Sequence, residues 1–188
     1  MKALIVDNHD SFTYNLAQLL EQAGCNATII KNDGQDVDAA GFDKIIFSPG
    51  PGIPSKEAGL MKSILHKYSA TKSILGICLG HQAIAEYYGA NLINLDKVFH
   101  GIKAKINIIE HKDYLFNGLP ETLNGGLYHS WGVSREGLPE CLKIIAISDE
   151  GIIMGISHKT YDVKGLQFHP ESIMTEHGAA IIKNWLQK

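Results

Sequence analysis

The sequence predicts an α/β fold, in which an open, mostly parallel and twisted sheet carries helices on both faces beside a small antiparallel sheet. Residues 1–88 alternate short apolar runs with segments whose apolar residues recur at helical spacing. Short connections between such strands and helices imply right-handed crossovers and a parallel sheet that is covered on both faces. After Gly89 the pattern changes to short alternating stretches, which are typical of antiparallel strands.

The first half of the chain supplies the parallel strands and their helices. Four apolar runs have the length of buried strands. They are residues 3–6, 27–30, 45–47 and 73–77. Three segments carry apolar residues at helical spacing, and Gly24 stands where the first of them should end as a helix. They are approximately residues 12–23, 58–68 and 79–88.

The second half supplies further strands and a closing helix. Four stretches are predicted as strands. They are residues 103–108, 142–147, 152–156 and 164–168. Asp149-Glu150-Gly151 is predicted to be a hairpin turn, and residues 178–186 have the pattern of an amphipathic helix. No repeat, low-complexity tract or linker interrupts the pattern, so residues 1–188 are expected to form a single domain.

The composition indicates a soluble globular protein and argues against several classes of partner. Of the 188 residues, 45% are hydrophobic and 20% are charged, and 17 basic against 20 acidic residues give a formal charge of −3. No basic run indicates nucleic-acid binding, and no apolar stretch approaches the roughly 20 residues that span a bilayer. Nothing resembles a targeting segment, and three widely spaced cysteines do not make a disulfide framework. We therefore expect a cytoplasmic protein with no nucleic-acid or membrane partner.

Cys78 lies where a buried strand must turn sharply into a helix, with Gly76 and Gly80 on either side. This spacing is the cysteine counterpart of the G-x-S-x-G nucleophile elbow, in which the glycines leave room for a strained turn. The turn presents the sulfur beside a helix N-terminus, whose positive end favours the reactive thiolate. The N–H of Leu79 is then placed to donate to a developing oxyanion. A buried, inert cysteine is the alternative interpretation.

His169 is the predicted base for this thiol. It directly follows a predicted strand, at the sheet edge where parallel sheets place their active sites. Pro170 favours an extended backbone at His169, and side chains two residues apart then point to the same side, so Glu171 can reach the imidazole. A carboxylate on one ring nitrogen leaves the other facing the thiol. A capping or core histidine is the alternative.

Neither a metal nor another cofactor is expected. His-x-Glu opens the zinc deaminase signature, but its Pro-Cys-x-x-Cys half is absent, as is His-Glu-x-x-His. The loop at residues 48–52, Ser-Pro-Gly-Pro-Gly, follows another predicted strand at the same sheet edge and does not match a phosphate-binding loop. We expect it to be a rigid backbone wall whose N–H groups complete an oxyanion hole, with a simple tight turn as the alternative.

Together, residues 48–52, 76–82 and 165–172 resemble, in order and spacing, the motifs of the class I (triad-type) glutamine amidotransferases. The resemblance covers essentially the whole chain and implies the flavodoxin-like fold of that family. The implied catalytic triad of nucleophile, base and carboxylate is Cys78, His169 and Glu171. The implied oxyanion donors are Gly52 and Leu79. The positions that resemble the glutamine-binding site are Gly50, Pro51, Gly52, Gln82, Ser130 and Trp131.

Two further segments narrow the branch of the family. Residues 7–15, Asp-Asn-His-Asp-Ser-Phe-Thr-Tyr-Asn, resemble the start of the glutamine subunits of anthranilate synthase and aminodeoxychorismate synthase, and residues 167–175 also resemble that branch. A helix N-cap at Asp10 or Ser11 is the alternative, although it explains one polar residue and not the whole string. The chain departs from this branch at Leu127, which is usually arginine, and at Trp131, which is commonly leucine.

The resemblance implies hydrolysis of L-glutamine through a γ-glutamyl thioester on Cys78. The ammonia is expected to pass to a chorismate-binding synthase subunit in a hetero-oligomer that makes anthranilate for tryptophan synthesis. A partner that makes aminodeoxychorismate for folate synthesis, or one subunit shared by both, is the alternative. Another amidotransferase branch, a hydrolase of a different γ-glutamyl or peptide amide, and a non-catalytic regulatory subunit are the competing hypotheses.

Overall fold

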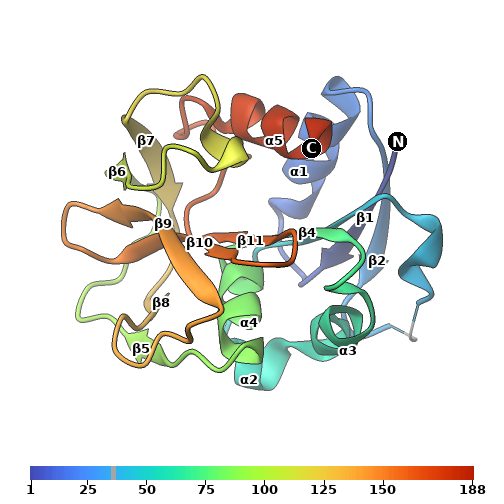
Figure 1. The fold of residues 1–188 in the computed structure, drawn as a ribbon, viewed down its shortest axis with the longest axis horizontal. Coiled ribbons are helices and arrows are strands. Elements are labelled where there is room, and N and C mark those ends of the chain that lie inside the picture. Colours follow the sequence, from blue (N-terminus) through green and yellow to red (C-terminus); the bar gives the residue numbers. More distant parts are fainter. Residues whose placement is uncertain (35–36) are drawn as a thin grey trace.

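The computed structural model describes residues 1–34 and 37–188. Within these ranges, nine strands form one sheet. They are β1 Lys2–Asp7, β2 Asn26–Lys31, β3 Lys44–Phe47, β4 Ser73–Ile77, β6 Ile102–Ile108, β7 Thr122–Leu127, β9 Leu142–Ser148, β10 Ile153–His158 and β11 Val163–Leu166. Their order in the sheet is β2-β1-β3-β4-β11-β10-β9-β6-β7 (Figure 1).

The sheet has a parallel half and an antiparallel half. Strands β2, β1, β3, β4 and β11 pair in parallel, whereas β10, β9, β6 and β7 continue the same sheet with antiparallel pairing. A separate small antiparallel sheet pairs β5 (Leu92–Asn94) with β8 (Trp131–Val133). The predicted fold class is confirmed, and the structure adds that most antiparallel strands extend the main sheet.

Helices cover both faces of the sheet. Helices α1 (Thr13–Gln22) and α5 (Gly178–Gln187) lie on one face, and α2 (Pro54–Glu57), α3 (Gly59–Tyr68) and α4 (Leu79–Tyr87) lie on the other (Figure 1). Two short 3₁₀ helices, Ala39–Gly41 and Tyr114–Phe116, complete the described elements.

Alternate residues of the central strands enter two separate apolar cores. In β1, Ala3 and Ile5 pack into the core beneath α1 and α5, whereas Leu4 and Val6 pack into the core beneath α3 and α4. A strand that is buried on both faces has no polar side to expose, which is why β1 reads as an unbroken apolar run. Within the described ranges, no helix is long and apolar enough to cross a membrane.

The parallel register brings four chain segments to one edge of the sheet. Strand β4 lies between β3 and β11, with Gly76 opposite both Phe47 and Gly165. The loop after β3, the Cys78 turn after β4 and the His169 segment after β11 therefore leave the sheet side by side. The segment after β1 joins them, since β1 pairs with β3 in parallel. This edge, at the carboxyl ends of parallel strands, is the usual place for a site in such a sheet.

Candidate active site

The backbone of Cys78 has the strained geometry that the flanking glycines predict. Its φ of 51° and ψ of −101° are unusual for a residue with a side chain. A Cβ atom on Gly76 would lie 2.3 Å from the carbonyl oxygen of Gly80, and one on Gly80 would lie 2.5 Å from that of Phe47. Strand, turn and helix therefore approach too closely at both positions for any side chain.

Helix α4 starts at this turn and leaves backbone donors free at its first residues. The first intrahelical bond runs from the N–H of Gln82 to the carbonyl of Cys78, at 3.0 Å. The N–H of Leu79, at the first position of the helix, has no intrahelical acceptor, as is general for helix starts. The predicted oxyanion donor at Leu79 thus directly follows the sulfur-bearing residue.

His169 and Glu171 form a buried pair beside Cys78. The Nδ1 atom of His169 lies 2.7 Å from Oε1 of Glu171, and the two side chains are 2% and 0% exposed. Burial opposes the charged imidazolium, but the neighbouring Cys78 sulfur and the Glu171 carboxylate outweigh it and raise the pKa of His169 to about 10. The other ring nitrogen, Nε2, has no hydrogen-bond partner among the described residues.

The segment that carries His169 is fixed against β7. The N–H of His169 donates to the carbonyl of Gly126 at 3.0 Å, and the hydroxyl of Thr175 donates to the carbonyl of His169 at 2.5 Å. A Cβ atom on Gly126 would lie 2.8 Å from Oγ of Ser172, so glycine permits the close approach. The imidazole is therefore held through its backbone as well as through Glu171.

The loop after β3 is tied to the segment after β1. The N–H of Asn8 donates to Oγ of Ser48 at 2.8 Å, and the Asn8 amide donates to the Ser48 carbonyl at 2.6 Å. A Cβ atom on Gly50 would lie 2.5 Å from that of Asn8 and 2.6 Å from a methyl group of Leu79. Gly52 has a φ of 76°, which glycine adopts without strain. The loop is thus a rigid wall packed against the start of α4.

Two cavities meet at Cys78. The smaller, of about 110 Å³, brings together the predicted substrate-site positions and adds two neighbours. Its lining residues are Gly50, Pro51, Gly52, Cys78, Gln82, Tyr128, His129, Ser130 and Trp131. The larger, of about 580 Å³, shares part of this wall and opens past His169 and the segment after β1. Its lining residues are His9, Asp10, Ser11, Phe12, Pro49, Gly50, Pro51, Cys78, His100, Tyr128 and His169.

The segment at residues 7–15 packs against His169 and also closes the turn that leads into helix α1. Phe12 is the N-cap of α1 and gives no side-chain cap, but Oδ1 of Asp10 accepts from the N–H of Phe12 at 2.8 Å, so the alternative of a capping role holds in part for Asp10. The Phe12 ring lies 5.3 Å from the His169 ring and 4.9 Å from the Tyr128 ring, between ring centres. The Phe12 ring of this segment therefore forms an aromatic wall beside the imidazole of His169.

Three polar residues beside Cys78 carry no role in the sequence prediction. Gln167 donates from Nε2 to the Cys78 sulfur at 3.5 Å, Tyr128 lines both cavities, and His129 lines the smaller one. One signal was available for Gln167, because residues 167 and 169 lie two apart in a segment predicted to be extended, so that their side chains are expected on the same side. No comparable spacing marks Tyr128 or His129 before the tertiary fold is known.

Two other histidines near Cys78, His81 and His129, favour the neutral form. Burial lowers the pKa of His81 to about 3 and that of His129 to about 4. Nδ1 of His129 lies 2.8 Å from the carbonyl oxygen of Trp131, which requires that this nitrogen carry the proton. Neither ring therefore competes with His169 as a charged partner for the sulfur.

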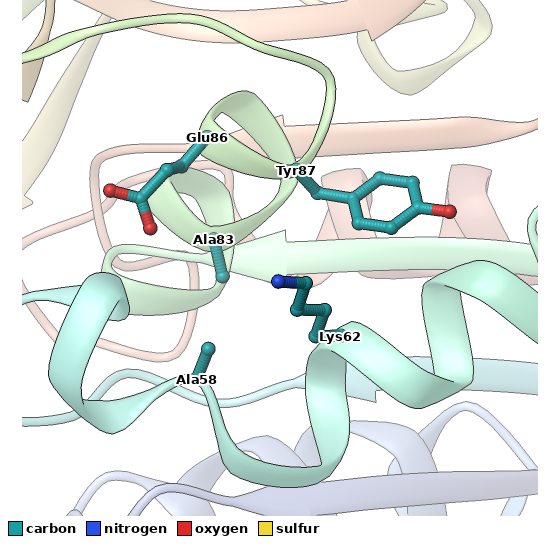
Figure 2. A pocket seen from close by; sticks show the side chains of 5 residues that line it. All are labelled: Ala58, Lys62, Ala83, Glu86 and Tyr87. Atoms are coloured by element: carbon teal, nitrogen blue, oxygen red, sulfur yellow. The ribbon is translucent and has the colours of Figure 1, made fainter.

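Other candidate features lie apart from the site. A cavity of about 200 Å³ between α3 and α4 is lined by Ala58, Lys62, Ala83, Glu86 and Tyr87. In Figure 2, Lys62 reaches toward α4 while Glu86 and Tyr87 point away to opposite sides.

Leu127 is fully buried in the core beneath α1 and α5. The described residues include no group of three or more His, Cys, Asp or Glu side chains placed to hold a metal ion.

The chain is similar to known proteins over nearly its whole length. The model of the family "Glutamine amidotransferase class-I" matches residues 4–188. The anthranilate synthase component 2 of Pseudomonas aeruginosa is 39% identical over 194 residues, which cover 98% of this chain and 94% of that protein. The aminodeoxychorismate synthase component 2 of Escherichia coli K12 is 40% identical over 189 residues, which cover 98% and 99%.

The solved structures agree at the level of the fold. The crystal structure of a glutamine amidotransferase from Thermotoga maritima has a TM-score of 0.74 at 17% identity, over 100% of this chain and 81% of that one. The family model and the relatives at 39% and 40% identity confirm the family that the three motifs predict. The chain belongs to the class I glutamine amidotransferase family.

Proposed function

We propose that this chain is the glutaminase subunit of a chorismate-using synthase, with Cys78, His169 and Glu171 as its catalytic triad. The observation that carries the proposal is the meeting of the strained Cys78 turn, the buried His169–Glu171 pair and the 110 Å³ cavity. Residues 1–188 act as one domain in this role, without metal or other cofactor. Three free cysteines support a reducing, cytoplasmic location.

The raised pKa of His169 supports an ion-paired resting state, in which the imidazolium faces the Cys78 thiolate. The sulfur attacks the side-chain carbonyl carbon of glutamine, and the N–H groups of Gly52 and Leu79 stabilise the oxyanion. His169 gives its proton to the departing nitrogen, so ammonia leaves and a γ-glutamyl thioester remains. The neutral imidazole then takes a proton from water, whose oxygen attacks the thioester to release glutamate and the thiolate.

The six positions assigned to substrate binding support glutamine as the ligand. Both hydrogens of the Gln82 amide are donated within the protein, to the Trp131 carbonyl at 2.9 Å and to Oε1 of Gln167 at 3.0 Å. The remaining polar atom of Gln82, Oε1, is an acceptor and suits the ammonium or amide N–H of glutamine. Gly50 and Pro51 form the facing wall, and the backbone of Ser130 and Trp131 holds the α-amino and α-carboxylate groups.

Ammonia is protonated in neutral water and loses its nucleophilicity, so its release is useful when a second active site receives it directly. The larger cavity, which opens from Cys78 past Phe12 and His100, suits the departure of ammonia toward such a partner. We propose a chorismate-binding synthase subunit as that partner. Similarity to both anthranilate synthase and aminodeoxychorismate synthase components supports this class of acceptor.

We propose anthranilate synthesis as the first alternative, with aminodeoxychorismate synthesis or a shared subunit as the second. The test is to isolate the chain with its partner and supply chorismate and glutamine labelled with ¹⁵N at the amide. Labelled anthranilate supports the first alternative, labelled aminodeoxychorismate the second, and both products a shared subunit. Label that appears as free ammonia alone, in the presence of the partner and chorismate, contradicts the proposal of a coupled synthase.

A further inference from the structure

Gln167 is a fully buried side chain that contacts the nucleophile and not the substrate space. Its Nε2 atom donates to Sγ of Cys78 at 3.5 Å, and it lines neither cavity that meets at Cys78. A hydrogen bond to a charged acceptor is about twice as strong as one to a neutral acceptor. The Gln167 amide therefore favours the sulfur most when the sulfur is a thiolate.

The direction of this amide is fixed by its neighbours. The carbonyl oxygen of Trp131 can only accept, so the Gln82 amide must present nitrogen to it, at 2.9 Å. The second hydrogen of the same nitrogen goes to Oε1 of Gln167 at 3.0 Å. With its oxygen so occupied, Gln167 must present nitrogen to the Cys78 sulfur. We call this chain of Trp131 carbonyl, Gln82, Gln167 and Cys78 the amide relay.

The first member of the amide relay is part of the cavity wall. Trp131 lines the 110 Å³ cavity, and its carbonyl also accepts from Nδ1 of His129 at 2.8 Å. Both lone pairs of that carbonyl are thus used within the protein. The position of the Gln167 amide, which donates to Cys78, consequently depends on the position of the segment that borders the substrate space.

We infer that Gln167 is a positioning residue that holds an N–H on the Cys78 thiolate, and that Gln82 ties this donor to the Trp131 wall. The inference rests on the proposed use of Cys78 as the nucleophile. The donor stabilises the sulfur anion before attack and again when the thioester breaks. Its loss slows both half-reactions, whereas glutamine binding, which uses other groups, is retained.

Gln167→Met tests the inference, because methionine keeps the length of the side chain and removes the amide. Gln18→Met, on the exposed side of α1, is the matched control. The readouts are the pH profile of Cys78 alkylation by iodoacetamide, and kcat and KM for glutamine. For Gln167→Met we expect slower alkylation near pH 6 by about tenfold, a profile moved to higher pH, and kcat lower by about 10- to 100-fold.

In the same variant KM should change by less than about twofold, because Gln167 contacts Cys78 and lines neither cavity, so that glutamine loses no contact with it. Gln82→Met should move the alkylation profile in the same direction and also raise KM, since Gln82 lines the cavity. The control Gln18→Met should match the native chain in all three readouts. A Gln167→Met profile that superimposes on the native one overturns the inference, even if kcat falls.

A measurement on the native chain covers the case in which the variants do not fold. The side-chain amide of Gln167, followed by ¹⁵N NMR, should shift when iodoacetamide turns the thiolate into a neutral thioether, and an unchanged resonance contradicts the contact. The outcomes also separate the two proposals. A native Cys78 no more reactive than Cys141 contradicts the proposed function, whereas a reactive Cys78 that is indifferent to Gln167→Met contradicts only the amide relay.

Discussion

Nδ1 of His169 lies 2.7 Å from Oε1 of Glu171, with both side chains buried and with Cys78 lining the same cavity as His169. The carboxylate holds a proton on the near nitrogen and directs the other nitrogen to the sulfur. For Glu171→Gln we expect kcat to fall by about 10²–10⁴-fold with little change in KM, since the group acts on proton transfer. Steady-state glutaminase kinetics measure this, and an unchanged kcat contradicts the role of Glu171.

The protonation state of His169 follows from its neighbours. Because the folded pKa is raised to about 10, the ion pair contributes to stability fully below the ordinary histidine pKa of about 6.5, and this contribution is lost as the pH rises through about 10. In ¹⁵N NMR the native ring should stay protonated from pH 6 to about 9, and Cys78→Ala should titrate at lower pH. A native His169 that titrates near 6.5 contradicts the ion-paired resting state.

Asp7 anchors the segment that leads to Phe12. Burial opposes its ionisation, but hydrogen bonds from Lys31 at 2.5 Å and from the Thr13 hydroxyl at 2.7 Å lower its pKa. A lowered pKa gives stability above the unfolded value of about 4 that is lost as the pH falls through the folded pKa. We expect Asp7→Asn to cost about 1–3 kcal/mol at pH 7 and less at pH 3, by urea unfolding at both pH values. An equal cost at both pH values argues against this ionic role.

A buried ion pair joins two residues that line neither cavity at Cys78. Nζ of Lys164 is 2.6 Å from Oδ2 of Asp113 and 2.9 Å from Oγ of Ser157, with both charged side chains under 10% exposed. Lys164→Met should cost about 3–5 kcal/mol in unfolding free energy, because it strands a buried carboxylate, and adding Asp113→Asn should recover part of the loss. The exposed pair of Lys103 and Glu176 is the control, and Glu176→Ala should leave the urea midpoint nearly unchanged.

The glycines of the Cys78 turn are required by packing. Gly80→Ala places a methyl group 2.5 Å from the Phe47 carbonyl oxygen, so β3 or α4 must shift. We expect a loss of about 1–3 kcal/mol in urea unfolding together with a fall in kcat as the sulfur moves. Gly41→Ala is the matched control, because no atom lies within 4 Å of its added methyl group. Equal behaviour of the two variants contradicts the steric account.

Much of the fold could be predicted because its determinants are local. Residues 73–77 read as a buried strand and form β4, since a strand buried on both faces leaves a continuous apolar run. The antiparallel pairing of β10 with β11 could not be predicted in the same way. The alternation of side chains indicates which face of a strand is buried, but it does not indicate which strand is its neighbour. The one-turn helix α2, Pro54–Glu57, is too short to show a period.

The features of the site likewise differ in whether a local sequence pattern predicts them. The turn at Cys78 was predictable, because its steric crowding requires glycine at fixed offsets. The contact of Glu171 with His169 was expected from an extended chain, whereas the structure makes it across a turn that the N–H of Ser172 closes on the carbonyl of His169. The contact of Gln167 with Cys78 spans 89 residues, and its direction depends on Gln82 and the Trp131 carbonyl. Such a hydrogen-bond direction is a property of the assembled fold and leaves no local pattern.

The most direct test of Cys78 as the nucleophile is covalent labelling by a diazoketone analogue of glutamine, followed by intact-mass and peptide mass spectrometry. Three free cysteines are present, at Cys25, Cys78 and Cys141. We expect one adduct per chain, located on Cys78, prevented by excess glutamine and absent from Cys78→Ser. A native chain that takes up no label, or a Cys78→Ser chain that is labelled as readily as the native one, contradicts the role of Cys78.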